Sequence, residues 1–184
     1  MKKNIVINCM EGYSSSVRPD EKTLSAVLEK FTKKYEKSIL SFNESNSNLS
    51  AVRKCRKFIK EHCDEKNNLF LIGKSLGGVK THKLLKKAWS TINTYNKVVV
   101  MFIDAHSPVP TFIGDCRNLK LKKEWKVDKR IYLNVYQKSK YPRGASVKNC
   151  TVEHFLEKDV DHWNIIKHPK TKELIQNAFD FLIV

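Results

Sequence analysis

Length, composition and charge already exclude several classes of protein. The 184 residues, 41% of them hydrophobic and nine of them phenylalanine, are enough for one domain with a sizeable core, and no apolar run approaches the roughly 20 residues that span a bilayer. The net charge of +16 is spread over lysines along the whole chain, so we expect a solvated basic surface with weak, non-specific attraction to anionic surfaces and no specific nucleic-acid partner.

Strand-like and helix-like segments alternate along the chain. Strands are predicted at residues 4–10, 38–42, 69–72, 97–103, 130–136 and 148–155, and helices at 23–37, 49–65, 76–91 and 171–182. Near-continuous apolar runs such as 98–103 are typical of parallel strands that are buried on both faces of a sheet. The pattern therefore predicts one three-layer α/β domain over residues 1–184, with about six mostly parallel strands and helices on both faces.

The start of the chain and its cysteines indicate the compartment. The apolar stretch 5–7 that follows Met1 is too short for the core of a signal peptide. The five cysteines are scattered and form no C-x-x-C pair, which indicates neither a disulfide framework nor a zinc site. We therefore expect a soluble cytoplasmic protein with reduced thiols.

The most informative motif is Gly-Lys-Ser-Leu-Gly at residues 73–77, which follows a predicted strand and opens a predicted helix. Such a sharp strand-to-helix turn has little room for side chains on either side of the serine, which accounts for the glycines. The turn holds the serine hydroxyl clear of the backbone. The motif therefore predicts that Ser75 is a nucleophile; the alternative is an ordinary strand-turn-helix joint in another α/β fold.

A serine hydroxyl needs a base that takes its proton, and the chain has six histidines. Four of them fall in or beside predicted helices and strands. His162 lies instead in a loop between the last strand and the last helix, near the sheet edge where Ser75 is expected. We predict that His162 is the base, with His106 as the reserve candidate and an ordinary surface histidine as the alternative reading.

The base in turn needs a carboxylate that fixes its orientation. Asp104 directly follows the strand after the serine motif, and the end of a packed strand holds a side chain rigidly. The next strand ends in Gln137 with no carboxylate. We therefore predict that Asp104 is the acid, with Asp115, Asp159 and Asp161 as lesser alternatives. The other interpretation of Asp104 is a turn residue without a catalytic role.

An acyl-transfer site also needs backbone N–H groups that face the developing negative charge, the oxyanion hole. Leu76 supplies one, because it follows the serine at the turn. The loop after the first strand should supply the other, and the predicted donor is Tyr13, next to Gly12, or a neighbouring residue.

These motifs together resemble the α/β-hydrolase superfamily, whose chain order of serine, aspartate and histidine is the order seen here. Two features depart from the family pattern: Glu11-Gly12 stands where His-Gly is usual, and the acid follows the sixth rather than the seventh strand of the family scheme. The first two family strands and a lid are also missing. The resemblance implies a small, lid-less hydrolase similar to esterases, lipases or thioesterases.

The reaction that this resemblance implies is cleavage of an ester or thioester of a small-molecule acyl substrate through an acyl-enzyme, with no metal or organic cofactor. Two other functions stay open from the sequence. One is a binding module that keeps the hydrolase fold without turnover, and the other is a protein whose basic surface binds polyanions or anionic membranes.

Overall fold

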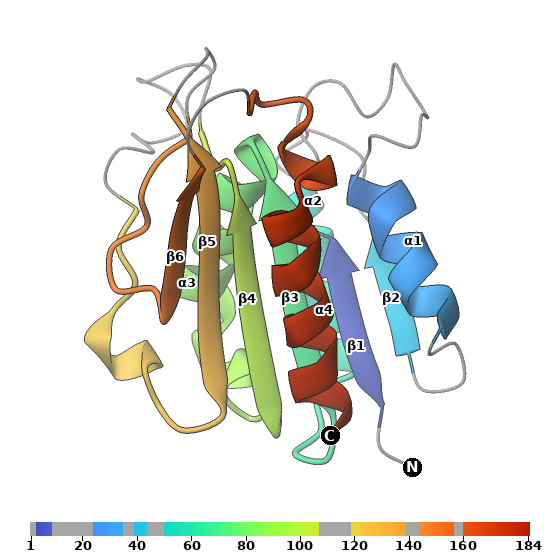
Figure 1. Cartoon of the computed structure of the whole chain (residues 1–184). Helices are drawn as coiled ribbons and strands as arrows, with labels where there is room; N and C mark the ends of the chain where they lie inside the picture. Colours follow the sequence, from blue (N-terminus) through green and yellow to red (C-terminus); the bar gives the residue numbers. More distant parts are fainter. Residues whose placement is uncertain are drawn as a thin grey trace.

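The computed structural model describes residues 3–8, 24–34, 39–43, 50–106, 119–138, 144–156 and 160–184. Its centre is a six-stranded sheet in the order β2-β1-β3-β4-β5-β6, in which every neighbouring pair is parallel (Figure 1). The strands are β1 (Asn4–Asn8), β2 (Ile39–Asn43), β3 (Asn68–Lys74), β4 (Lys97–Ile103), β5 (Arg130–Gln137) and β6 (Val152–Leu156). The predicted parallel α/β architecture is confirmed.

Among the described residues, four α-helices cover the two faces of the sheet (Figure 1): α1 (Leu24–Lys34), α2 (Ser50–Glu61), α3 (Leu76–Ile92) and α4 (Pro169–Ile183). Helices α1 and α4 pack on one face through a cluster that includes Leu28, Phe70 and Phe179. Helices α2 and α3 pack on the other face through a second cluster that includes Ile59 and Leu85. The central strands β3 and β4 contribute alternate side chains to both clusters, which explains their uninterrupted apolar sequence.

The last strand and last helix begin at different residues from those predicted. Strand β6 begins at Val152 rather than Lys148, because Lys148 makes only a single bridge with Lys120 before the chain turns. Helix α4 begins earlier than predicted, at Pro169. The backbone N–H of Lys170 in the first turn donates to His168 Nδ1, and proline is favoured at the first helical position.

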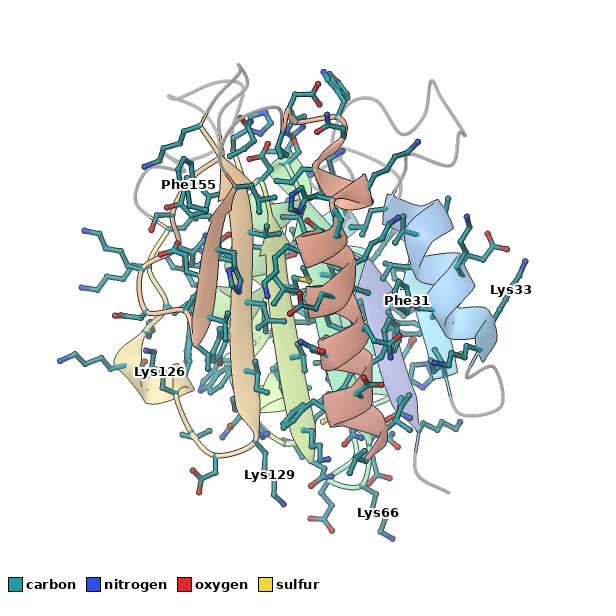
Figure 2. The ribbon with its side chains drawn as sticks, in the orientation of Figure 1. Phe31, Lys33, Lys66, Lys126, Lys129 and Phe155 are labelled. Carbon is teal, nitrogen blue, oxygen red and sulfur yellow. The ribbon has the colours of Figure 1, made fainter. Side chains whose placement is uncertain are left out.

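Lysine side chains point outward from α1 and from the segments that connect elements, as Lys33, Lys66, Lys126 and Lys129 show in Figure 2. Lys74 and Lys80, at the end of β3 and in α3, are exceptions because both are buried. No helix in the described part of the chain is both long and apolar enough to cross a membrane.

Candidate active site

Ser75 stands between β3 and α3 in a strained backbone conformation, with φ 57° and ψ −128°. A non-glycine residue with positive φ is costly and persists only where the surrounding structure holds it. Three backbone hydrogen bonds hold it here. The Ser75 N–H donates to the carbonyl of Ile103 on β4 at 2.9 Å, and the Ser75 carbonyl accepts from the N–H groups of Gly78 at 3.0 Å and His106 at 3.3 Å. The turn thus fixes the position of the serine relative to the end of β4.

Two glycines beside Ser75, Gly73 and Gly78, are required by close packing. A Cβ at Gly73 would lie 2.5 Å from Thr81 Oγ1, and a Cβ at Gly78 would lie 2.6 Å from the Cβ of Ala105. Both distances are shorter than any normal contact. The turn therefore has the geometry that the motif predicts, with helix α3 pressed against the residue that follows Asp104.

Leu76 is the first residue of α3, so its backbone N–H has no carbonyl acceptor within the helix. A free N–H at a helix N-terminus attracts negative charge, as an oxyanion donor must. The second predicted donor, Tyr13, lies outside the described residues, as do Glu11 and Gly12.

Asp104 directly follows β4 and is fully buried, with φ 45°. Its carboxylate accepts two hydrogen bonds from Gln137 at the end of β5: from the backbone N–H to Oδ1 at 3.1 Å and from Nε2 to Oδ2 at 3.2 Å. The Asp104 N–H donates to the carbonyl of Val135 at 2.7 Å. The carboxylate is therefore held in one orientation by the neighbouring strand.

His162 lies in the turn between β6 and α4, and its Nδ1 is 2.5 Å from Oδ2 of Asp104. Both side chains are buried, so this contact is shielded from water. The alternative acid Asp161 does something else: its Oδ1 accepts from the backbone N–H groups of Trp163 and Asn164, both at 2.8 Å. Asp161 thus shapes the turn that carries His162. The other two alternatives, Asp115 and Asp159, lie outside the described residues.

His106, two residues beyond Asp104, lies between the serine and the other histidine. Its Nδ1 is 3.4 Å from Ser75 Oγ and 3.2 Å from the backbone carbonyl of Asp104. Its ring meets the ring of His162 edge to face, with the centroids 4.5 Å apart. Within the described part of the chain, the hydroxyl of Ser75 makes its side-chain contact with His106 rather than with His162.

The carbonyl contact determines which tautomer of His106 fits. A backbone carbonyl only accepts hydrogen bonds, so a favourable contact requires the hydrogen on Nδ1. Burial is the main cause that lowers the pKa of His106, and the nearby His162 lowers it further. The hydrogen bond and the charge of Asp104 oppose this with smaller effects, and Lys74 adds the smallest lowering effect. The His106 ring is therefore neutral near pH 7, with Nδ1–H directed at the Asp104 carbonyl and the Ser75 oxygen.

Trp163 and Lys74 form part of the surroundings of this site. The indole of Trp163 is 54% exposed and meets the His162 ring edge to face, with the centroids 5.3 Å apart. Lys74, the residue before Ser75, places its ammonium group 5.9 Å from the centre of the same indole. The site is therefore bordered on this side by an exposed indole, with the buried Lys74 beside it.

Sequence reasoning missed two residues that support Asp104. In the sequence, Gln137 marks only the absence of a carboxylate after its strand. In the structure, it hydrogen-bonds both oxygens of the Asp104 carboxylate. Gly144 lies so close to Asp104 Oδ1 that a side chain there would overlap it. Neither role has a local sequence signal, because each depends on how β5 and the segment at 144 pack beside β4.

Comparison with known proteins supports the fold. No family model and no curated protein sequence matches the chain. Among solved structures, a novel cutinase-like protein from Cryptococcus sp. is similar with a TM-score of 0.56 and 12% sequence identity, over 98% of this chain and 95% of that one. At this identity the likeness shows a shared α/β fold over almost the whole chain.

Proposed function

We propose that the protein is a serine hydrolase that cleaves an ester or thioester of a small-molecule acyl substrate, with Ser75, His162 and Asp104 as its catalytic residues. The observation that carries this proposal is the 2.5 Å contact between His162 Nδ1 and Asp104 Oδ2, beside a serine held at a strained strand-to-helix turn. The three residue types and their order along the chain are those of a nucleophile, an acid and a base in this fold.

The contact with Asp104 directs the proton chemistry of His162. An ionised carboxylate only accepts, so His162 Nδ1 carries the hydrogen and Nε2 is left free to take a proton. The negative charge of Asp104 then stabilises the imidazolium that forms. His162 is thereby prepared to act as a base.

His106 does not fit the role of base. Its Nδ1 is the nitrogen that contacts Ser75 Oγ, and this nitrogen holds the hydrogen that is donated to the Asp104 carbonyl. It can donate to the serine oxygen but cannot remove its proton. Hydrogen bonds between nucleophile and base are often loose without substrate. The proposal requires Ser75 Oγ to turn from His106 towards His162, whose ring contacts the ring of His106.

The reaction has two halves. In the first, His162 Nε2 takes the proton of Ser75, Oγ attacks the acyl carbonyl, and the protonated His162 returns the proton to the departing alcohol or thiol. In the second, His162 deprotonates a water that attacks the acyl-enzyme, and the proton then passes to Ser75 as the acid is released. The N–H of Leu76 and the predicted donor Tyr13 would hold the oxyanion in both halves.

Hydrolysis of a panel of activated esters and thioesters near neutral pH tests this proposal. Ser75→Ala should remove nearly all activity, whereas Ser90→Ala, a matched change at an exposed position on the same helix α3, should retain it. Equal activity of Ser75→Ala and the unmodified protein would exclude this serine as the nucleophile. Folded protein that cleaves none of the substrates would favour the binding-module alternative.

A further inference from the structure

Three side chains that can bind metals meet at the carboxyl end of β4. Asp104, His106 and His162 each offer one ligand atom, and these atoms lie within 4.8 Å of one another. Asp104 and His106 come from the end of the same strand, whereas His162 arrives from the turn before α4, so the fold itself brings the group together. Asp104 and His162 are buried and His106 is partly buried.

The donor set suits one class of ion. Two imidazoles and one carboxylate are ligands that zinc prefers, and three protein ligands leave one tetrahedral position for a water or another oxygen. The hydroxyl of Ser75 lies 3.4 Å from His106 Nδ1 and is placed to approach that fourth position. Magnesium, by contrast, prefers oxygen ligands in octahedral geometry and fits this set poorly.

We propose that Zn²⁺ binds to Asp104, His106 and His162 and thereby inhibits the protein. The binding step depends only on the three ligands, and the inhibition rests on the hydrolase function proposed above. The ion is an inhibitor in this account and takes no part in the reaction.

Zinc binding requires a specific rearrangement. With bonds of about 2.0 Å, two ligand atoms on a tetrahedral zinc lie roughly 3.3 Å apart, which is longer than the 2.5 Å between His162 Nδ1 and Asp104 Oδ2. Asp104 is held by Gln137 and by its contact with Gly144, so the histidine rings are the parts that must shift. A neutral imidazole binds zinc through the nitrogen that carries no hydrogen, so His162 must change tautomer: Nδ1 loses its hydrogen, Nε2 takes one up, and no net proton is released. The metal then takes the place of the hydrogen on Nδ1.

This exchange explains why the ion would inhibit. The unmetallated pair orients His162 through its Nδ1–H and Asp104, and this orientation is what prepares Nε2 to accept a proton from Ser75. A metal between the two side chains removes that hydrogen bond and draws His106 and the serine oxygen into its own coordination. Binding and catalysis are therefore mutually exclusive.

Equilibrium dialysis of the whole protein against zinc chloride in a chelator-free buffer tests the site without requiring turnover. We expect one zinc per chain, and binding at least about tenfold weaker in His106→Gln and in Asp104→Asn. His154→Gln, a matched change on strand β6 outside the cluster, should bind zinc like the unmodified protein. Magnesium chloride should give no saturable binding.

Two results would overturn the proposal: no zinc bound by the unmodified protein, or equal affinity in His106→Gln and His154→Gln. Circular dichroism checks that each variant is folded. If one of His106→Gln and Asp104→Asn does not fold, the zinc affinity of the other is enough for the comparison. A second measurement, ester hydrolysis with zinc and then with excess chelator, should show reversible inhibition. If the protein binds zinc but hydrolyses no ester, the zinc site stands and the proposed function is refuted. If the protein hydrolyses esters but neither binds zinc nor is inhibited by it, the proposed function stands and the zinc site is refuted.

Discussion

Gly144 lies directly against the carboxylate of Asp104, and a Cβ at this position would overlap Asp104 Oδ1. The N–H of Gly144 donates to the carbonyl of Gln137 at 2.9 Å, so the glycine is fixed beside the residue that holds the other side of the carboxylate. Asp104 is therefore enclosed between a side-chain donor and a position that tolerates no side chain. This enclosure, together with His162, defines its orientation.

Gly144→Ala should displace the Asp104 carboxylate from His162. Because misplacement of a catalytic group by about 1 Å can cost roughly a hundredfold in rate, we expect a loss of that order in kcat/KM, with the protein still folded. Steady-state kinetics on an activated ester, together with denaturant unfolding, measure both quantities. Unchanged kinetics in a folded variant would mean that the carboxylate does not need this position.

Asp104→Asn should lower kcat by about 10⁴-fold, because the amide favours the wrong tautomer of His162. Asp161→Asn is the matched control in the neighbouring turn, where the oxygen that accepts from Trp163 and Asn164 is retained. We expect it to keep most of the activity. A reversed order of the two variants would move the acid from the end of β4 to the histidine turn.

Gly78→Ala should destabilise the fold by about 1–3 kcal/mol, which is typical of overpacking, since the new methyl group would meet Ala105. Ser90→Ala on the exposed side of the same helix should leave the free energy of unfolding nearly unchanged. Urea unfolding followed by circular dichroism measures both. If Gly78→Ala were as stable as Ser90→Ala, α3 and the residue after Asp104 would not be in close contact.

The buried His82 and the partly buried His106 should make stability depend on pH. Burial lowers the pKa of His106 and of His82, in the second case despite a hydrogen-bond contact with the carbonyl of Lys120. At pH values between the lowered pKa of the folded state and the usual histidine pKa of about 6.5, the unfolded chain binds more protons than the folded chain. The free energy of unfolding therefore rises with pH in this window and falls as the pH is lowered through it. Unfolding at about pH 7 and pH 5 should give a smaller difference for His82→Gln than for the unmodified protein. An equal difference would show that His82 titrates normally in the folded state.

Much of this arrangement was accessible from the sequence because its signals are local. The apolar run that forms β4 and the glycines around Ser75 predict a parallel sheet and a sharp turn, and both are present. The position of Asp104 at the end of β4 followed from the same run. These features depend on residues that are neighbours along the chain.

The remaining features depend on contacts between distant segments. Gln137 and Gly144 reach Asp104 only after β5 pairs with β4, and the direction of the His106 ring is set by the Asp104 carbonyl rather than by any motif. The prediction of Tyr13 as an oxyanion donor falls outside the described residues and stays a prediction. Spacing along the chain therefore locates the site, whereas side-chain packing decides how its groups are oriented.

The most direct test of the central claim is covalent labelling with a fluorophosphonate, followed by mass spectrometry of the digested protein. We expect one adduct per chain, located on Ser75, with labelling abolished in Ser75→Ala, retained in Ser90→Ala and strongly slowed in Asp104→Asn. Folded protein that forms no adduct, or one whose adduct maps to another residue, would contradict the assignment of Ser75 as the nucleophile.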